Sequence, residues 1–472
     1  MRLDSLHLQN FRGYENRTFS FHPRFNLVVG DNGAGKTSLL EACSIAIGSW
    51  MLGIPGVDSR NIAPGDVRRV LDFVEKRYRE LPQYPVSVTA SGAVHVAKAS
   101  RAANGQIEYE PLSATGQPNP RESDVTWLRS IEAPSGRTTR VGANDLKKKA
   151  TVMAKSVLQQ QPYVLPLIRY FGAGRLWERV LPSKALGRLP GKQPAELAAD
   201  ADEIDKALWA ENRLSEPFHG YHMSLDRRCN AEDLLRWMYV ERRNELDQQT
   251  ESAALRLVYQ AIESMLPEVV TARYAILLKT LVLVYENGER HTFTDLSDGY
   301  RNVVTIAADL AIKASMLNPQ LAEKALEFTP GVVLIDELDL HLHPKWQRRI
   351  IDDLRRTFPK MQFICTTHSP QLIGQAKPEE IIMLDVASAH PVQSLGMDSN
   401  WVLRHIMGSD DRDPSVAAEL DAIFEHIDRS NFEPAQQAVD SLRSRIGEHP
   451  ELVEAQALID RYTRFSSSIA GE

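Results

Sequence analysis

The stretch Gly30-Asp31-Asn32-Gly33-Ala34-Gly35-Lys36-Thr37 fits the pattern G-x-x-x-x-G-K-[ST] at every fixed position. It follows a continuous apolar run, Phe25 to Val29, and precedes a segment with helical apolar spacing. Its glycines let backbone N–H groups curl around a phosphate, toward which the next helix points its positive end. The stretch therefore predicts the strand, loop and helix at the centre of an α/β phosphate-binding fold.

The side chains of this loop suit a nucleotide that is bound together with a magnesium ion. We expect Lys36 to reach the β- and γ-phosphates and Thr37 to offer its hydroxyl to the metal. The other predicted nucleotide contacts are Asn32, Gly33, Ala34, Gly35 and Ser38. The predicted cofactors are ATP and Mg²⁺. An ordinary glycine turn is the alternative, and the strand and helix around the pattern argue against it.

Two acidic residues end another apolar run. Val332 to Ile335 is followed by Asp336 and Glu337, which puts both carboxyl groups at the carboxyl edge of a parallel sheet. We expect Asp336 to hold Mg²⁺ and Glu337 to polarise the attacking water. A helix cap or a solvated acidic turn is the alternative for this pair.

A histidine follows a third apolar run. Met361 to Cys365 reads as a buried strand that leads to His368, and the chain after Asp336 is long enough for one crossover helix. An imidazole at that edge could hydrogen-bond the γ-phosphate or the attacking water. Because a lone histidine is more often a surface residue, this prediction depends on its place after the other motifs.

The stretch LSDGYRN, Leu296 to Asn302, opens an apolar helix. Ser297 and the N–H groups after it form a second anion-seeking helix start, far along the chain from the first. A glycine loop, a long insert, this helix start, the paired acids and the histidine follow one another along the chain. That order resembles the ABC-type ATPases of the SMC and RecF kind, whose fold is an α/β head with central parallel strands and an N-terminal antiparallel edge.

This resemblance implies further roles. LSDGYRN looks like a variant of the family's LSGGQ signature, which implies that Ser297, Asp298 and Gly299 cap the ATP of a partner chain in a homodimer. The opening Gln9 to Tyr14 also matches the family, which implies that Arg12 lies along the nucleotide. An exposed arginine on an edge strand is a nearly equal alternative. For the family's phosphate-sensing glutamine, residues 159–161 are candidates only.

Other segments narrow the resemblance. The HLHP form at 341–344 is similar to that of OLD-type ATPases, but the tail carries no paired-acid pattern for a nuclease domain, so we expect no intrinsic nuclease. Ile168 to Arg175, the segment 341–350 and the acid-rich helical tail together resemble the PtuA ATPases of Septu and retron anti-phage systems. This resemblance implies a homodimer, or a larger assembly of dimers, that regulates a PtuB-like HNH nuclease and meets nucleic acid through that complex.

Two other functions stay open. One is a DNA-repair ATPase of the RecF kind that binds DNA directly, and the other is a nucleotide-gated scaffold with negligible turnover. Basic residues that could serve a DNA groove are Lys147, Lys148, Lys149, Arg227, Arg228, Arg236, Arg242 and Arg243. A solvated charged face is the simpler account of them.

Composition sets broad limits. A chain of 472 residues that is 43% hydrophobic suits a soluble protein of two or three domains. Its net charge of -7 argues against coating nucleic acid with the whole surface, but not against a local groove. Three widely spaced cysteines indicate reduced thiols. With no signal peptide and no run of about 18 apolar residues, we expect a cytoplasmic protein without membrane contact.

The expected domain division has three parts. Residues 1–60 and 270–395 should form the ATPase head, 61–269 an insertion that partly completes it, and 396–472 a helical tail that is a candidate partner-binding surface. Within these parts we expect the following local elements. They are a hairpin of Val86–Thr89 with Gln106–Tyr109, a buried strand Tyr163–Phe171, helix over Ala231–Met265, core strands Ala275–Leu278 and Leu281–Tyr285, and three helices in the tail.

Overall fold

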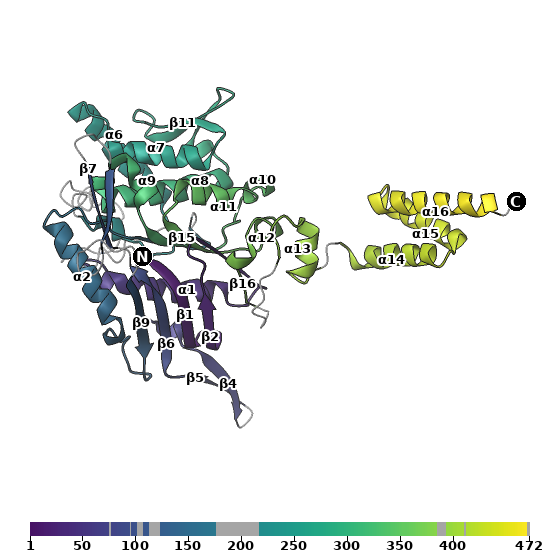
Figure 1. Cartoon of the computed structure of the whole chain (residues 1–472), viewed down its shortest axis with the longest axis horizontal. Helices are drawn as coiled ribbons and strands as arrows, with labels where there is room; N and C mark the ends of the chain where they lie inside the picture. The colour runs from purple at the N-terminus through teal and green to yellow at the C-terminus, as the bar shows by residue number, and fades with distance from the viewer. Residues whose placement is uncertain are drawn as a thin grey trace. The chain divides into compact units, whose positions relative to one another are not determined.

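Five parallel strands form the central sheet of the first unit of the chain, and two of them, β15 and β16, are labelled in Figure 1. In spatial order they are β10 (Leu167–Phe171), β14 (Gly331–Ile335), β15 (Met361–Thr366), β3 (Phe25–Val29) and β16 (Ile381–Met383). Every residue of β10, β14, β15 and β3 is buried. Such continuous burial is typical of parallel strands that are covered on both faces. Because all neighbours run parallel, the loops after β3, β14, β15 and β10 emerge at one edge.

Four antiparallel strands form a separate sheet beside the parallel one. Their order is β2 (Tyr14–Ser20), β1 (Arg2–Phe11), β6 (Val86–Val94) and β9 (Ser123–Ile131). Helix α1 (Lys36–Ile47) contacts strands of both sheets and buries almost all of its residues. The Trp127 indole of β9 donates to the Ala46 carbonyl of that helix. The predicted α/β head, with central parallel strands and N-terminal antiparallel strands, is confirmed.

The computed structural model describes residues 1–74, 77–94, 96–101, 107–112, 123–175, 217–384, 393–409 and 412–469. Its contacts divide the chain into two compact units, Met1–Gly396 and Met397–Glu472. The loop-rich prediction for residues 180–225 lies mostly outside the described residues. No helix within the described ranges is both long and apolar enough to cross a bilayer.

Helices pack on the face of the parallel sheet opposite α1. The long helix α8 (Asp298–Leu317) contacts β10 and α7 (Ala253–Met265), and α7 also contacts α11 (Ile350–Thr357). The predicted helical stretch Ala231–Met265 is two helices. Helix α6 (Ala231–Gln248) ends where Gln249 takes a φ of 53°, and the Ser252 side chain caps α7.

The first unit contains further helices and strands. They are η1 (Gly48–Gly53), η2 (Pro64–Asp66), β4 (Arg69–Val74), β5 (Arg77–Pro82), β7 (Val96–Arg101), β8 (Ile107–Leu112), η3 (Val141–Ala143), α2 (Asn144–Leu158), η4 (His219–Tyr221), β11 (Val269–Ala275), β12 (Thr280–Tyr285), β13 (Arg290–Thr292), η5 (Phe293–Asp295), η6 (Pro319–Lys324), α9 (Ala325–Phe328), α10 (Pro344–Gln347), α12 (Pro370–Ile373) and η7 (Pro378–Glu380).

Three local predictions were wrong. Val86–Thr89 does not pair with the segment ending at Tyr109, because β6 pairs with β1 and β9 while β8 pairs with β7. Of the expected core strand Ala275–Leu278, only Ala275 is in β11, and Leu277 and Leu278 form the exposed turn before β12, at 94% and 63% exposure. The buried strand near Tyr163 begins only at Leu167, after Pro166.

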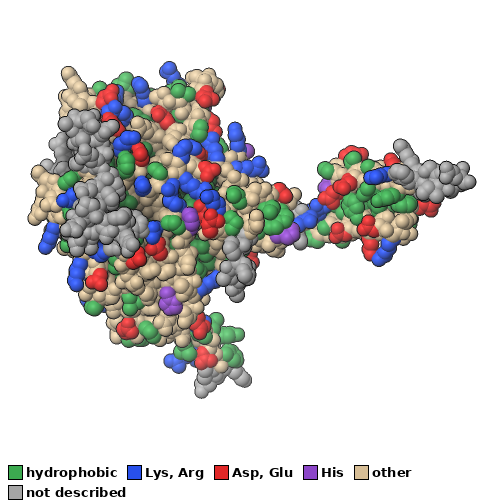
Figure 2. Space-filling view, viewed as in Figure 1, with side chains coloured by type: hydrophobic (Ala, Val, Ile, Leu, Met, Phe, Trp, Pro, Cys, Tyr) green, Lys and Arg blue, Asp and Glu red, His purple; other side chains and the backbone are tan. Residues whose placement is uncertain are grey.

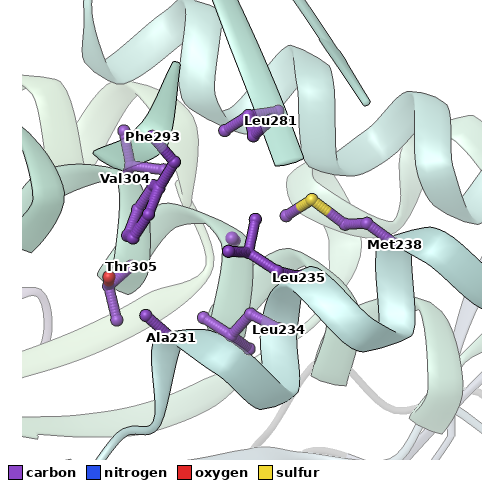
Figure 3. A pocket seen from close by; sticks show the side chains of 9 residues that line it. Ala231, Leu234, Leu235, Met238, Leu281, Phe293, Val304 and Thr305 are labelled. Carbon is purple, nitrogen blue, oxygen red and sulfur yellow. The ribbon is translucent and has the colours of Figure 1, made fainter. Parts of the chain in front are cut away.

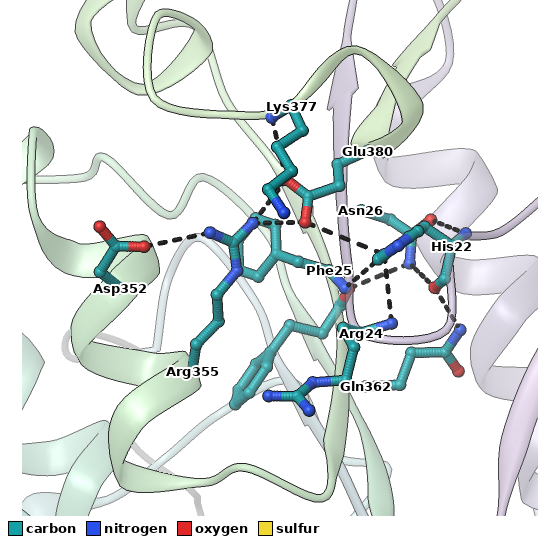
Figure 4. Close-up of polar contacts among 10 residues, drawn as sticks. His22, Arg24, Phe25, Asn26, Asp352, Arg355, Gln362, Lys377 and Glu380 are labelled. Carbon is teal, nitrogen blue, oxygen red and sulfur yellow. Dashed lines mark hydrogen bonds and ion pairs between the residues drawn. The ribbon is translucent and has the colours of Figure 1, made fainter. Parts of the chain in front are cut away.

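A polar cluster ties the amino edge of the parallel sheet together (Figure 4). Arg355 of α11 donates to the Glu380 and Asp352 carboxylates, and its guanidinium lies 5.2 Å from the Phe25 ring centroid. Gln362 of β15 donates to the carbonyl oxygens of Leu3 and His22. The start of β15 is thereby joined to β1 and to the loop before β3, on the side away from the candidate site.

The second unit begins with α13 (Ser399–His405) and continues as a bundle of α14 (Pro414–Asp428), α15 (Phe432–Ile446) and α16 (Pro450–Ile469). Its core is Leu420, Ile423, Ile427, Ala435, Val439, Leu442, Leu452, Ala455 and Ile459. The three predicted tail helices are confirmed. Residues 413–472 carry 12 Asp and Glu against 5 Arg and Lys, and acidic side chains are visible around this unit in Figure 2.

Candidate functional site

The glycine loop lies at the carboxyl end of β3. Gly33 and Gly35 have φ of 88° and 100°, which favour glycine, and a Cβ added at Gly33 would meet nothing within 4 Å. The Lys36 ammonium is buried and donates to the carbonyl oxygens of Gly30 and Asp31, at 2.6 and 2.8 Å. Asn32 is exposed at the tip of the loop, and Ala34 and Ser38 are half-buried. The loop thus curls around the Lys36 ammonium and leaves free space beside Gly33.

The hydroxyl of Thr37 and the carboxylate of Asp336 meet beside this loop. Thr37 Oγ1 donates to Asp336 Oδ2 at 2.9 Å, and Thr366 Oγ1 donates to Asp336 Oδ1 at 2.7 Å. Asp336 is buried, with 4% of its surface exposed. A hydroxyl and a carboxylate at this separation are the oxygen donors that Mg²⁺ takes, so the donor set fits the predicted metal.

Arg175 connects the two acids to α8, the helix that begins at LSDGYRN. The sequence prediction did not include Arg175 among the site residues. Its guanidinium donates to the carbonyl oxygens of Asp336 (2.7 Å), Glu337 (3.1 Å) and Gly172 (3.0 Å). It also donates to Asn302 Oδ1 on α8 at 2.6 Å. Burial lowers the pKa of Arg175 to about 10, with Asp336 opposing that shift, so the side chain is charged at neutral pH. The signal for it was the Gly-Ala-Gly-Arg turn after a buried strand.

Glu337 and His368 follow β14 and β15 at the same edge. Glu337 has a φ of 51°, and its N–H donates to Thr366 Oγ1 at 2.7 Å, which fixes the backbone turn that carries the carboxylate. Both side chains are half-buried. Across the described part of the chain, no side chain or backbone group hydrogen-bonds the His368 imidazole. Both groups are therefore open to a ligand at this edge.

The helix start LSDGYRN lies against the segment after the paired acids. Asn302 Nδ2 donates to the Leu340 carbonyl, and a Cβ on Gly299 would come within 2.5 Å of the His341 carbonyl oxygen. Ser297 is exposed, and its hydroxyl makes no capping bond to the N–H groups of α8. Asp298 is partly exposed and pairs with Arg301. The exposed Ser297 hydroxyl is therefore not used to cap its own helix.

Arg12 lies near the glycine loop but already has acidic partners. Its guanidinium contacts Asp66 at 2.7 Å and lies 4.0 Å from Glu41 of α1. The neighbouring Tyr14 hydroxyl donates to the Gly35 carbonyl at 3.0 Å. The predicted position of Arg12 beside the nucleotide loop agrees with this geometry, while its role stays a prediction.

The glutamines proposed as phosphate sensors lie elsewhere. Residues 159–161 are exposed after α2 and precede β10, so they approach the amino edge of the sheet. Where β10 reaches the candidate site, the chain has Gly172 to Arg175 instead. The glutamine candidates are therefore excluded from this site by topology.

Most of the basic residues considered for DNA have acidic neighbours on their own chain. The pairs are Lys148 with Asp145, Arg227 with Glu41, Arg228 with Asp226, Arg242 with Glu245, and Arg243 with Asp247. On the face shown in Figure 2, many Lys and Arg side chains lie beside Asp and Glu side chains. Outside the surroundings of Arg227, this pairing reduces the positive charge that these residues could offer to a DNA backbone.

A small apolar cavity of about 10 Å³ lies between α6, α8 and β12 (Figure 3). It is lined by Ala231, Leu234, Leu235, Met238, Leu281, Phe293, Val304, Thr305 and Ala308. Among the described residues, the buried Thr305 hydroxyl has no hydrogen-bond partner. This volume is close to that of a single water molecule, so the cavity is a packing defect rather than a ligand site.

Two family models match this sequence. The model described as "AAA domain" matches residues 5–264, which is more than half of the chain. The chain belongs to this AAA domain family. A second model, described as "AAA domain, putative AbiEii toxin, Type IV TA system", matches residues 236–374 of the AAA domain chain.

Curated relatives narrow the kind of AAA domain protein. "Retron Ec83 probable ATPase" of Escherichia coli is 26% identical over 444 residues, covering 88% of this chain and 77% of the relative. "Septu protein PtuA" of Bacillus thuringiensis is 29% identical over 169 residues, covering 34% of this chain and 42% of the relative. "Retron Vc95 probable ATPase" of Vibrio cholerae serotype O1 biovar El Tor is 40% identical over 102 residues, which is 22% of this chain and 20% of the relative.

These relatives confirm the resemblance to RecF proteins and to PtuA: the AAA domain chain is an ATPase of the retron, PtuA and RecF type. Among solved structures, the crystal structure of the SmcHead bound to the C-winged helix domain of ScpA has a TM-score of 0.41 and 16% identity. That match covers 81% of this chain and 94% of the other. The fold of the AAA domain chain is defined by its own strand order and register.

Proposed function

We propose that this protein binds and hydrolyses ATP in a Mg²⁺-dependent reaction. The observation that carries the proposal is the convergence of Lys36, Thr37 and Asp336 at one sheet edge, with Thr37 Oγ1 and Asp336 Oδ2 only 2.9 Å apart. A buried lysine in an open glycine cradle supplies positive charge for the β- and γ-phosphates. A hydroxyl beside a carboxylate supplies oxygen ligands for the metal.

In this proposal each residue has one task. Bound Mg²⁺ would neutralise charge on the phosphates. Lys36 stabilises the phosphate oxygens, Glu337 orients and polarises the attacking water, and His368 hydrogen-bonds the γ-phosphate or that water. Arg175 holds the backbone of both acids in position through their carbonyl oxygens. It is a positioning residue in this scheme.

We further propose a homodimer with shared sites. Ser297 is exposed and its hydroxyl does not cap α8, while Gly299 packs against the His341 carbonyl. A helix start of this kind binds an anion that is supplied from outside. In the proposed dimer, Ser297, Asp298 and Gly299 contact the γ-phosphate of ATP held by Lys36 of the second copy.

The proposed biological role is control of a partner HNH nuclease of the PtuB kind in anti-phage defence, within a dimer or an assembly of dimers. Support comes from relatives named as retron ATPases and Septu PtuA proteins. The acidic second unit, with its separate hydrophobic core, is a candidate surface for that partner. A RecF-like protein that binds DNA by itself has weaker support, because most of the basic residues that it would use are paired with acids.

The test is the mass in solution of the Glu337→Gln protein with and without ATP and Mg²⁺, and with and without the product of a neighbouring nuclease gene. The proposal expects a nucleotide-dependent dimer and a stable complex with the nuclease. A dimer that never takes up the nuclease would keep the ATPase proposal and remove the defence role. Failure to bind ATP at all would remove both.

Shared sites have a separate test in mixed dimers. Ser297→Arg and Lys36→Ala proteins should each lack ATPase activity. Mixed together, they should recover up to about a quarter of wild-type activity, since one of the two sites in half of the dimers is then intact. An unchanged zero rate, with mixed dimers demonstrated by mass, would show that Ser297 does not act across the dimer.

A further inference from the structure

Residues 217–230, here called the strap, cover the free edge of the parallel sheet. The Ser224 carbonyl accepts from the Tyr170 N–H of β10 at 2.9 Å, and the Arg227 carbonyl accepts from the Gly172 N–H at 2.7 Å. A Cβ on Gly172 would come within 2.7 Å of the Arg227 Cβ, so the strap and β10 lie in close contact there. The strap therefore extends the hydrogen bonding of β10 near the carboxyl end of that strand, where the candidate site lies.

Two buried cations fix the backbone of the strap. Arg169 of β10 is paired with Asp309 of α8 at 2.7 Å, and its other N–H groups donate to strap carbonyl oxygens. Lys313, one turn further along α8, also donates to strap carbonyl oxygens. The acceptors are Met223, Asp226 and Arg228 for Arg169, and Gly220 and His222 for Lys313. Because its carbonyl groups are held in this way, the strap presents the Arg227 side chain from a fixed position.

That side chain reaches a carboxylate next to the glycine loop. Glu41 is fully buried on α1, one helical turn after Thr37. Arg227 lies 3.2 Å from one of its carboxylate oxygens, Arg60 contacts the other, and Arg12 lies 4.0 Å from that second oxygen. Three guanidinium groups from three separate segments thus converge on one carboxylate beside the predicted phosphate cradle.

The cluster has more hydrogen-bond donors than its acids can use. A carboxylate accepts about four hydrogen bonds, whereas each guanidinium offers five N–H groups. Asp66 takes the Arg12 guanidinium, and the Arg227 side chain remains 52% exposed. Burial lowers the pKa of Arg60, and repulsion from Arg12 and Arg227 adds to that lowering against the attraction of Asp66. An anion with several oxygens would satisfy the unused donors and the excess positive charge.

We propose that Arg227 is a phosphate-binding residue of the nucleotide site, delivered by the strap. This inference rests on the proposed function, because the phosphate belongs to bound ATP. Glu41 orients the guanidinium, and the N–H groups that Glu41 leaves unused donate to phosphate oxygens. The strap thereby joins the ATP site to α8, whose N-cap is Ser297. The residues that hold the strap, Arg169 and Lys313, therefore link nucleotide binding to this helix.

The test measures the affinity of the full chain for ATP with Mg²⁺ by titration calorimetry, together with thermal unfolding in the absence of nucleotide. Arg227→Ala should weaken ATP binding by about tenfold or more, as expected for the loss of charged hydrogen bonds. Arg227→Lys should recover part of the affinity, because it keeps the charge and loses the fork. Arg228→Ala is the matched control on the same strap, because the Arg228 side chain is paired with Asp226. The affinity of this variant for ATP should stay within about twofold of the wild-type value.

A purely structural role for Arg227 makes the opposite prediction. It would lower the unfolding temperature without nucleotide and leave ATP affinity unchanged, and that result overturns the inference while the ATPase proposal stands. Equal losses for Arg227→Ala and Arg228→Ala would also overturn it, because they would indicate a general distortion of the strap. If the wild-type chain binds no ATP, the proposed function and the inference both fail. If Arg227→Ala does not fold, Arg227→Lys and Arg227→Gln take its place in the titration.

Discussion

Replacing Arg175 with methionine removes the hydrogen bonds that join the paired acids to the signature helix. The side chain is 1% exposed and makes four hydrogen bonds, to Asn302, Asp336, Glu337 and Gly172. Hydrogen bonds from charged groups contribute about 1.5–3 kcal/mol each, but relief from burying the charge offsets part of the loss and the terms are not additive. Methionine leaves four buried neutral oxygen atoms without their donor, and an unsatisfied buried group of this kind costs about 1–3 kcal/mol before the structure relaxes.

We therefore expect Arg175→Met to lower the free energy of unfolding by about 4 kcal/mol, measured by urea denaturation of the purified protein. ATPase activity of the fraction that remains folded should fall more than tenfold, because the backbone that carries Asp336 and Glu337 is released. Arg175→Lys keeps the charge but cannot reach all four acceptors, so its free energy of unfolding should lie between those of the wild type and Arg175→Met. A destabilisation below about 1 kcal/mol with normal turnover would refute the idea that this guanidinium holds the acids in place.

Three further predictions concern α8 and its neighbours. Gly299→Ala puts a Cβ within 2.5 Å of the His341 carbonyl oxygen, so overpacking of about 1–3 kcal/mol should appear in urea denaturation, together with a loss of ATPase activity; wild-type values for both would contradict the close approach. Burial lowers the pKa of Lys313 to about 8, against the attraction of Asp309. Above about pH 8 the unfolded chain binds the extra proton, so the contribution of this group to stability rises with pH up to about 10.5. Wild type should therefore gain about 2 kcal/mol relative to Lys313→Met between about pH 7 and pH 9.5, and parallel pH profiles would show that Lys313 has an ordinary pKa. Thr305→Val removes a buried hydroxyl without a partner beside the small cavity and should raise the unfolding temperature by an amount equivalent to about 1 kcal/mol; a lower temperature would mean that the hydroxyl binds water.

The sequence located the parts of the site that are encoded by short, continuous patterns. Lys36 and Thr37 are fixed by the glycine loop, and Asp336 follows a fully apolar strand, so the meeting of Thr37 and Asp336 follows from parallel pairing alone. His368 reached the same edge for the same reason. Parallel strands bring their carboxyl ends together whatever the length of chain between them.

Residues that act through distant backbone groups could not be found in this way. Arg175 and Arg169 donate mainly to carbonyl oxygens, which every residue has, so no side-chain pattern marks their partners. Strand pairing was ambiguous for a related reason. Alternating residues mark β6 as a strand, but they do not reveal that it pairs with β1, some eighty residues earlier. Leu277 and Leu278 were placed in the core because apolar residues in a tight turn look the same as a strand.

The register of β3 has a consequence for how this chain folds during synthesis. All five residues of β3 are buried, yet both of its neighbours in the sheet, β15 and β16, are made more than 330 residues later. At about 5–20 residues per second, the apolar strand leaves the ribosome roughly 20–70 s before its last neighbour is available. The glycine loop after β3 therefore cannot be completed early, and the nascent chain must keep β3 from aggregating until residue 383 has emerged.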